Sequence, residues 1–290
     1  MKQTLNKIIK KMNLKVLQID SVPESYSSIV SKLLLTKGEK VILKISHNKR
    51  KYHREMNTLK LLKGTLNVPH LLDTFEDEEY VMLLSYIDGL PPQGAINRKL
   101  AFEFGENLAK IHSVSLDYYG DINQTNTEDN KKVLWADVIN EHFTLWIEDT
   151  ESYLDRKLHN KCVKFINEKM KLLTKNVNPV VCHYDFRPGN ILVQDDHVVG
   201  VIDFESSRGG QAEVDFTQMK KYVWERYEGT EESFLSGYKS VRSLPDLENL
   251  LPFYEFYNAF GSIAWAIRRG YFNSPEMVTE NVNKLNSMFK

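Results

Sequence analysis

The chain has 290 residues, and its 38 basic and 39 acidic side chains nearly cancel to a formal net charge of −1. Without a charge surplus it has no general attraction to nucleic acid or to an anionic membrane, so we expect neither as a partner. The length, with 42% hydrophobic residues, suggests about two domains or one two-lobed unit whose core folds without disulfides.

Targeting signals and cysteines also limit the function classes. No apolar run approaches the roughly 18 residues of a membrane-spanning helix. Cys162 and Cys182 have neither metal-site spacing nor a secretory context, so we expect reduced thiols in a cytoplasmic protein. We expect the protein to be a monomer or a weak dimer.

The pattern of the N-terminal third predicts a sheet with helices. Residues 1–14 interleave lysines with apolar residues at helical spacing, which predicts an amphipathic helix docked on the N-terminal lobe. A helix lying on a membrane surface is the alternative. A further helix is predicted at about 50–63, and strands are predicted near 14–20, 27–36, 40–46, 70–76 and 79–85.

Lys44 ends an apolar strand that is close to the V-A-I-K form. A lysine flanked by Leu43 and Ile45 needs an anionic partner if its ammonium leaves water. The candidate partners are nucleotide phosphates and Glu55, on the following helix. The alternatives are a strand-edge lysine in solvent and a glutamate on a solvated helix face.

The rest of the chain is mostly helical. Apolar residues recur at helical spacing in several long segments. The predicted helices lie near 100–112, 134–155, 158–175, 212–225, 230–240, 247–269 and 275–288.

Asp185 and Asn190 stand in the order D-x-x-x-x-N, on a loop tightened by a Pro-Gly pair. A return strand at 198–204 ends in Asp203, so a hairpin is predicted to bring all three side chains to one end. The strands that enter and leave the loop are predicted at 180–182 and 191–193.

This set suits phosphoryl transfer from ATP. Asp185 could orient a hydroxyl, while Asn190 and Asp203 offer the hard oxygen ligands that Mg²⁺ prefers. Each acid taken alone is more often a cap or turn former, but the order and strand context together favour the chemical interpretation. The predicted cofactors are therefore Mg²⁺ and ATP, or GTP in its place.

At these residues the chain resembles the aminoglycoside phosphotransferase and choline-kinase-like family. HYDFRPGNIL followed by VIDFE is similar to its catalytic-loop and metal-binding segments. The resemblance covers about residues 15 to 270 and implies an α+β, two-lobed protein-kinase-like fold, with an N-terminal antiparallel sheet plus helix and a mostly helical C-terminal lobe. It implies a nucleotide-binding lobe at 1–84, a hinge at 85–89, and a lobe at 90–290 with the catalytic loop and acceptor site.

The resemblance also implies roles for single residues. Lys44 would bind the ATP α- and β-phosphates and Glu55 would pair with it. Asp185 would be the catalytic base, and Asn190 and Asp203 the metal ligands.

Further roles follow from the same resemblance. Asp215 would brace the catalytic loop, and the backbone at Ser85 and Ile87 would contact adenine. Arg187, two residues after the base, could touch the γ-phosphate, or it could form a salt bridge with a neighbouring acid.

The chain departs from the protein-kinase pattern in two places. The stretch that would cover the phosphates has no glycine, although Ser27 and Ser28 could offer hydroxyls and N–H groups to phosphate. Glu205 stands where protein kinases have the Gly of D-F-G, and no A-P-E segment follows, which disfavours a protein kinase.

The acceptor is a small hydroxylated molecule, and an aminoglycoside is the first expectation. Choline, homoserine, methylthioribose or a macrolide are the other acceptors considered, and a catalytically inactive binding module is the rival from another class. A polycationic acceptor needs an acidic pocket, for which the candidates are Glu141, Glu148, Asp149, Glu151, Asp155, Glu205, Glu255 and Glu276. Aromatic candidates for stacking are Trp135, Trp146, Trp224, Trp265, Tyr254 and Tyr257.

Overall fold

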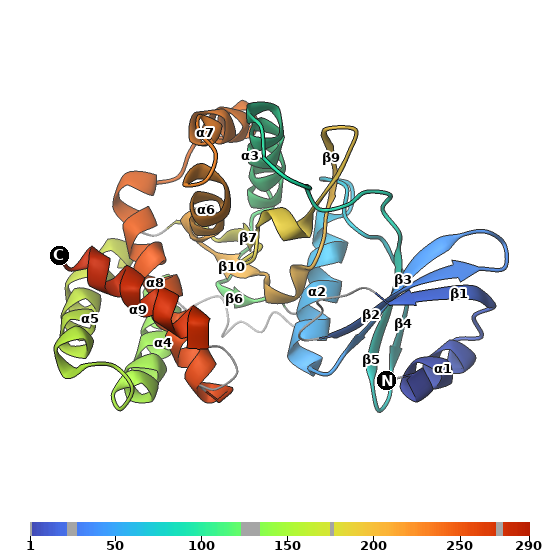
Figure 1. Cartoon of the computed structure of the whole chain (residues 1–290), viewed down its shortest axis with the longest axis horizontal. Helices are drawn as coiled ribbons and strands as arrows, with labels where there is room; N and C mark the ends of the chain where they lie inside the picture. The colour runs from blue at the N-terminus through green and yellow to red at the C-terminus, as the bar shows by residue number, and fades with distance from the viewer. Residues whose placement is uncertain (1, 22–27, 123–133, 175–176, 271–274) are drawn as a thin grey trace.

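The structure is a computed structural model that describes residues 2–21, 28–122, 134–174, 177–270 and 275–290. Its N-terminal strands are β1 (Val16–Ser21), β2 (Ser28–Leu35), β3 (Lys40–Ser46), β4 (Leu71–Glu76) and β5 (Tyr80–Ser85). They form one antiparallel sheet in the order β1-β2-β3-β5-β4 (Figure 1). Lys44 on the central strand β3 lies opposite Met82 on β5.

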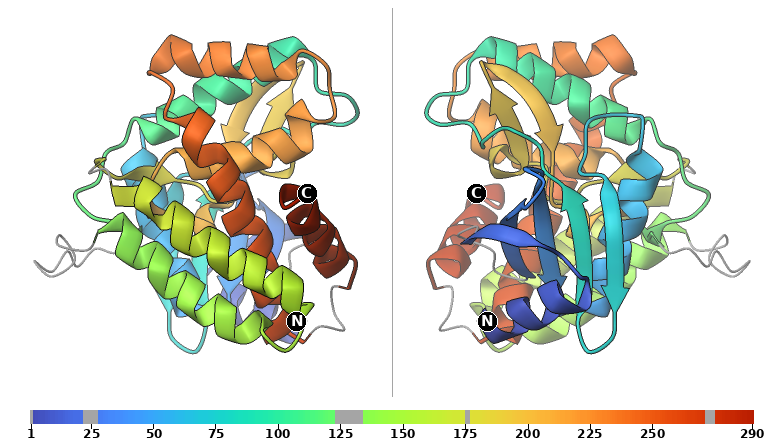
Figure 2. Two further views of the ribbon diagram at one scale, coloured as in Figure 1. Left: turned by 90° about the vertical axis from the view of Figure 1, so that its left-hand side faces the viewer. Right: turned by 90° about the vertical axis from the view of Figure 1, so that its right-hand side faces the viewer.

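Helix α1 (Lys2–Lys11) docks on this sheet, as its amphipathic pattern predicts. Leu5 and Ile8 are buried in one cluster with Leu33 and Leu43 of the sheet. Figure 2 shows the helix lying beside the strands. Lysines on its outer face pair with acids of the β4–β5 turn, Lys7 with Glu78 and Lys11 with Asp77. The acidic β4–β5 turn is therefore a contact surface for α1.

Helix α2 (Lys49–Leu62) lies between the sheet and the helical part of the chain (Figure 1). The Asn48 side chain caps it by accepting a hydrogen bond from the Lys51 N–H. Its buried Tyr52 and Leu59 belong to a hydrophobic cluster that also contains Met82 of β5 and residues from the helical part. This shared core holds the two parts of the molecule together.

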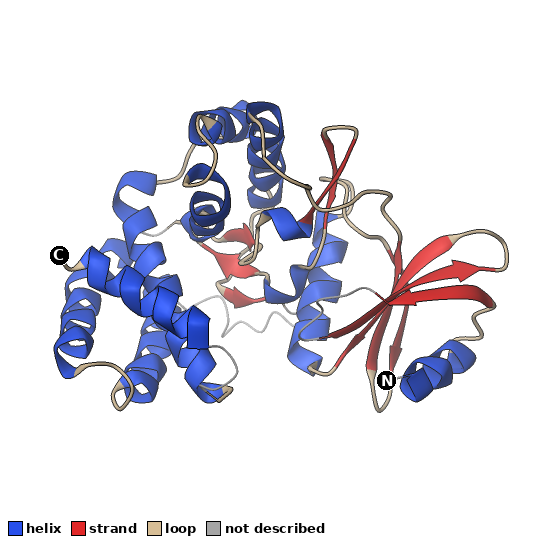
Figure 3. Ribbon diagram, viewed as in Figure 1, coloured by secondary structure: helices blue, strands red, loops and turns tan. Residues whose placement is uncertain are grey.

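The C-terminal part is mostly helical, and Figure 3 shows the helices gathered on one side of the molecule. This arrangement confirms the predicted α+β architecture, with an N-terminal antiparallel sheet plus helix and a mostly helical C-terminal lobe. The helices are α3 (Arg98–His112), α4 (Trp135–Thr150), α5 (Arg156–Lys169), α6 (Glu213–Met219), α7 (Thr230–Val241), α8 (Leu247–Arg268) and α9 (Pro275–Met288).

Three helix boundaries differ from the predicted ones for local reasons. The helix predicted at 134–155 ends at Thr150, because Asp155 caps the next helix with its carboxylate. That next helix gives way to a 3₁₀ turn after Lys169. The segment predicted as one helix over 212–225 is α-helical only to Met219, and residues 220–224 form a π-helical turn.

Short strands carry the loops between the helices. A hairpin of β8 (Ile191–Gln194) and β9 (His197–Val201) stands beside a small sheet in the order β6-β10-β7 (Figure 1). The predicted return strand therefore stops at Val201, and Phe204 begins a 3₁₀ turn. The strands of the small sheet are β6 (Gly120–Asp121), β7 (Val180–Cys182) and β10 (Arg208–Gly210).

Two global expectations can be compared with the described residues. None of the helices in these ranges is long and apolar enough to span a bilayer. Cys162 and Cys182 are both buried free thiols.

Candidate active site

Lys44 is buried at the centre of a cluster of ion pairs. Its Nζ lies 2.7 Å from a carboxylate oxygen of Glu55 and 2.7 Å from one of Asp203. A third carboxylate, from Glu205, lies 3.4 Å away. The alternative of a strand-edge lysine in solvent is therefore wrong, because the Lys44 side chain is only 8% exposed.

The acids determine the charge state of this lysine. Burial alone lowers the pKa of an ammonium, but the carboxylates of Glu55, Asp203 and Glu205 outweigh it and raise the pKa of Lys44. Burial also raises the pKa of Glu55 above its usual range, against the lowering effect of Lys44. One ammonium is thus shared by three acids, and an anionic ligand near Lys44 would have to compete with them.

Glu205 has a position that the sequence analysis did not assign to it. Its second oxygen lies 2.7 Å from Lys51 Nζ, and the Ser28 hydroxyl donates over 3.3 Å to the oxygen that faces Lys44. The side chain is 10% exposed and lies between Lys44 and Lys51. Its charge is therefore already matched by two ammonium groups, which gives no support to its proposed place in an acidic acceptor pocket.

Asp215 holds the catalytic loop by its backbone. Its two carboxylate oxygens accept hydrogen bonds from the N–H groups of His183 and Tyr184, both at 2.6 Å. The His112 ring lies 3.0 Å from the same carboxylate and 2.9 Å from the hydroxyl of Tyr238. Tyr184 has φ +64°, a left-handed conformation that costs free energy for a non-glycine residue. We infer that Asp215 offsets this cost.

Replacing Asp215 by Ala is expected to destabilise the protein by about 2–5 kcal/mol, because two buried N–H donors lose their acceptor. Urea unfolding of the full chain measures the change. Asp215→Asn keeps one carbonyl acceptor and should lose less. An Asp215→Ala protein as stable as the parent would contradict the bracing role.

Asp185 lies on this loop with its side chain 31% exposed. Arg187 Nε donates to both of its oxygens, at 3.1 and 3.2 Å, and Asn190 Nδ2 donates to one of them at 2.8 Å. Burial raises the pKa of Asp185, and Arg187 and Asn190 only partly oppose it. Of the two roles considered for Arg187, the structure shows the salt bridge.

Asn190 and Asp203 are brought together by backbone pairing. The Ile202 N–H donates to the Asn190 carbonyl over 3.0 Å, which places Asn190 beside the residue preceding Asp203. Asn190 Nδ2 is used on Asp185, so its Oδ1 is the atom left to face a cation. Asp203 is 36% exposed and has φ +66°, a conformation that turns the chain sharply after β9. An amide oxygen and an accessible carboxylate fit a Mg²⁺ ion.

The remaining nucleotide-side predictions concern serines and the proposed hinge. Ser27 lies outside the described residues, and Ser28 is buried with its hydroxyl directed at Glu205. Ser85 closes β5, and its N–H donates to the His70 carbonyl over 2.9 Å. Ile87 packs against β9, where a Cβ on Gly200 would come within 2.7 Å of its Cδ1. Any adenine contact at Ser85 would therefore use its carbonyl oxygen.

A second cluster on α2 was missed by the sequence analysis. Arg54 donates to the Glu205 carbonyl at 3.0 Å and pairs with Asp121 at 2.5 Å. Arg50 pairs with the same carboxylate. The spacing of Arg50, Arg54 and Glu55 along α2 already put them near one face, but nothing in the sequence indicated the partner on β6.

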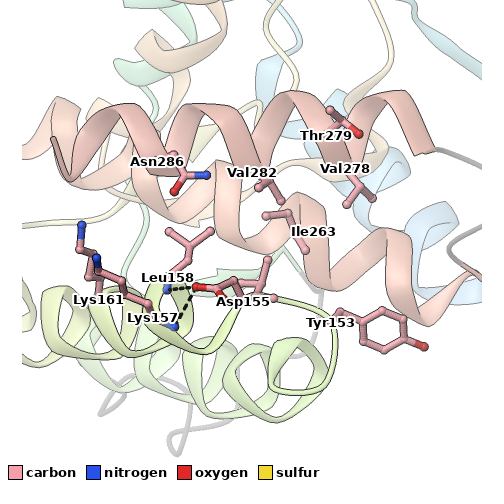
Figure 4. A pocket seen from close by; sticks show the side chains of 11 residues that line it. Tyr153, Asp155, Lys157, Leu158, Lys161, Ile263, Val278, Thr279, Val282 and Asn286 are labelled. Carbon is pink, nitrogen blue, oxygen red and sulfur yellow. Dashed lines mark hydrogen bonds between the residues drawn. The ribbon is translucent and has the colours of Figure 1, made fainter.

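A cavity of about 510 Å³ lies elsewhere, between α5, α8 and α9 (Figure 4). Apolar residues such as Leu158, Ile263 and Val282 line it together with Lys157 and Lys161. Asp155, one of the candidate acids for an acceptor pocket, borders it, but none of the residues predicted for catalysis, nucleotide or metal does. It therefore has no part in the chemistry considered for Asp185 and Lys44.

Comparisons with known proteins agree with this geometry. A family model described as the phosphotransferase enzyme family matches residues 21–252. No curated protein matches the chain in sequence.

Solved structures share the fold at low sequence identity. A protein assigned as a fructosamine-3-kinase, from Thermobifida fusca YX-ER1, has TM-score 0.74 and 16% identity over 98% of this chain and 97% of that one. A thermostable mutant of aminoglycoside phosphotransferase APH(4)-Ia, in a ternary complex with AMP-PNP and hygromycin B, has TM-score 0.73 and 15% identity over 98% and 96%. The macrolide 2'-phosphotransferase MphH from Brachybacterium faecium has TM-score 0.68 and 13% identity over 97% of each chain.

Proposed function

Because the chain belongs to the phosphotransferase enzyme family, and is thus a small-molecule phosphotransferase, we propose that it transfers the γ-phosphate of ATP to a hydroxyl with the help of Mg²⁺. One observation carries this proposal. Lys44 Nζ lies 2.7 Å from a carboxylate oxygen of Glu55 and 2.7 Å from one of Asp203, although Lys44 and Asp203 are 159 residues apart in the chain. GTP in place of ATP is the alternative nucleotide.

The proposed nucleotide site lies on the sheet side. Lys44 binds the α- and β-phosphates, and Glu55 holds its ammonium in position. The backbones at Ser85 and Ile87 contact the adenine ring, and Ser28 lies near the phosphates. These roles imply a nucleotide-binding lobe at 1–84, a hinge at 85–89 and a C-terminal lobe at 90–290.

The proposed transfer step takes place at the catalytic loop. Asn190 and Asp203 hold Mg²⁺, which neutralises charge on the phosphates when it is bound. Asp185 accepts a hydrogen bond from the acceptor hydroxyl and orients its oxygen toward the γ-phosphate. Arg187 holds the Asp185 carboxylate at 3.1 Å and could also reach the transferred phosphoryl group.

The aminoglycoside acceptor expected from the sequence has little support among the described acids. Asp149 pairs with Arg268 at 2.5 Å, and Asp155 caps α5. Glu255 is held between Lys220 and Lys284, at 2.7 and 2.9 Å. These carboxylates already have partners. Among the remaining candidates, Glu141, Glu148 and Glu276 are exposed on helices, and Glu151 is exposed in the turn after α4.

The aromatic candidates mostly serve the core. Trp135 and Tyr254 are buried and hydrogen-bonded to each other at 2.6 Å. Tyr257 is also buried, and it packs against Trp146. An acceptor that stacks on a ring would therefore find few exposed faces among these residues.

Magnesium-dependent release of ADP is the experiment that tests the proposed function. Purified full-length protein is given Mg-ATP or Mg-GTP with aminoglycosides, macrolides, choline, homoserine, methylthioribose and other small alcohols. We expect acceptor-stimulated ADP release that EDTA abolishes. Tight nucleotide binding without release by any acceptor would favour the catalytically inactive binding module instead.

The pH dependence of turnover should report the Asp185 carboxyl. Burial raises its pKa, and the base must be ionised to accept a proton, so activity should fall as the pH drops through this raised pKa. The acid limb of kcat is therefore expected above about 3.9, the usual value of an aspartate. Arg187→Gln removes a cation that lowers the Asp185 pKa and should move the limb further upward. A limb at or below the usual value would contradict this assignment.

A further inference from the structure

The guanidinium of Arg208 lies beside the catalytic loop. Arg208 is on β10, opposite Asp121 on one side and Cys182 on the other. Its Cζ lies 5.0 Å from the centre of the Tyr184 ring, and Tyr184 directly precedes Asp185. The ring supports one face of the guanidinium, as in other arginine–aromatic stacks. Arg208 is therefore held against the residue that directly precedes Asp185 in the chain.

No carboxylate among the described residues neutralises Arg208. Its Nε is buried and has no hydrogen-bond partner within those ranges. The nearest acid by register, Asp121, already pairs with Arg50 and with Arg54 at 2.5 Å. The guanidinium groups of Arg50, Arg54 and Arg208 thus surround a single described carboxylate, that of Asp121.

The positive charge of Arg208 lowers the pKa values of two neighbouring basic groups. Burial lowers the pKa of Arg54, and the charge of Arg208 lowers it further. Burial, followed by the charges of Arg208 and Arg50, lowers the pKa of His142 to about 4, so this ring is neutral at pH 7. The local field therefore opposes a cation and favours an anion.

The same region offers hydrogen-bond donors. The Tyr184 hydroxyl is buried without a partner among the described residues, as is Arg208 Nε. Both atoms are shielded from solvent, and Gly210 packs closely against the hydroxyl, since a Cβ there would lie 3.2 Å from it. An arginine can bind a carboxylate through two parallel N–H groups.

We propose that Arg208 binds a carboxylate group of the acceptor, so that the substrate is a hydroxylated carboxylic acid. The inference rests on the proposed phosphotransferase function and specifies its substrate class. The carboxylate would form an ion pair with the Arg208 guanidinium while a hydroxyl of the same molecule reaches Asp185. A polycationic acceptor would meet the positive charge of Arg208 at this point, and the candidate acids Asp149 and Glu255 are already held by basic side chains.

Matched acceptors that differ in one group test the proposal. The first series is gluconate, gluconamide and glucamine, and the second is glycerate, glyceramide and 3-aminopropane-1,2-diol. Binding is measured by calorimetry with the full chain and Mg-AMP-PNP, and turnover by ADP release from Mg-ATP. We expect the carboxylate of each series to bind about 10- to 100-fold more tightly than its amide, and the amine to bind weakest.

Substitutions then assign the effect to one side chain. Arg208→Gln should abolish the preference for the carboxylate and leave AMP-PNP affinity unchanged, while Arg208→Lys should retain part of it. Arg226→Gln is the control, because the Arg226 guanidinium also lies over a tyrosine, at 5.2 Å from the Tyr222 ring. It should behave as the parent protein does.

The outcomes separate this inference from the function on which it rests. Equal binding of carboxylate and amide in both series, or a preference that survives Arg208→Gln, overturns the inference. ADP release stimulated by glucamine or an aminoglycoside would also overturn it, while supporting the phosphotransferase function. Binding of gluconate that depends on Arg208, without ADP release by any acceptor, would support the carboxylate site and count against the function.

Discussion

Turnover should fall by about 100- to 10,000-fold when Asp185 is replaced by Ala, with little change in nucleotide affinity. Asp185 is the carboxylate that would orient the acceptor hydroxyl, and a positioned base contributes roughly 3–5 kcal/mol to lowering a reaction barrier. Its side chain is partly exposed and contacts Arg187 and Asn190, and it is proposed to bind neither the phosphates nor Mg²⁺. Its loss should therefore affect kcat and leave binding of Mg-ADP intact.

Two controls distinguish chemistry from folding at this position. Asp185→Asn keeps the shape and the contact with Asn190, so it should unfold like the parent protein and still lose turnover. Asp196→Ala changes an exposed aspartate in the β8–β9 turn, and it should retain full activity. Wild-type turnover in both Asp185 variants would remove this residue from the mechanism. The measurement is steady-state ADP release, with calorimetric titration of Mg-ADP.

The catalytic loop was predictable because its residues are close in the sequence. The D-x-x-x-x-N spacing and the flanking strands predict that Asp185 and Asn190 lie on one tight loop. In the structure Asn190 Nδ2 lies 2.8 Å from a carboxylate oxygen of Asp185. The pairing of Lys44 with Glu55 was also predictable, because a lysine on a buried strand requires an acid and the next helix supplied one.

Contacts between distant elements were not predictable in the same way. Glu205 was considered for an acceptor pocket, but a 3₁₀ turn after the left-handed Asp203 directs it to Lys44 and Lys51. That turn depends on a single backbone conformation that residue types do not specify. The position of Arg208, which has no carboxylate partner in the described part of the chain, likewise depends on the pairing of β10 with β6, which joins segments 87 residues apart. Such pairings are set by tertiary packing, and the local pattern carries little information about them.

The second large effect is expected at Lys44. We predict that Lys44→Met lowers the stability of the chain by about 3–5 kcal/mol and turnover by about 100-fold or more. Glu55 is 3% exposed and Lys44 is its one ion-pair partner among the described residues, so the substitution leaves a buried carboxylate uncompensated. Glu205 retains Lys51, and the Asp203 side chain is 36% exposed, so these two acids should be affected less.

The pH dependence of this stability loss identifies its cause. Burial raises the pKa of Glu55 in the folded state, and removal of Lys44 takes away the group that lowers it. A carboxyl group with a raised folded pKa binds a proton more tightly in the folded chain than in the unfolded one. Folding of the variant should therefore weaken as the pH rises above about 4.3, the unfolded value, and recover below it. Urea unfolding between pH 4 and 8 measures this difference.

A double substitution separates the structural role of Lys44 from its catalytic one. In Lys44→Met with Glu55→Gln the buried charge is absent, so most of the lost stability should return and its pH dependence should flatten. Turnover should stay low, because no ammonium remains to meet the nucleotide phosphates. Lys7→Met is the control for a lost ion pair at the surface, since Lys7 and Glu78 are both exposed, and it should leave stability almost unchanged. If the double variant regained turnover along with stability, Lys44 would be a structural residue, and the nucleotide phosphates would have to bind elsewhere.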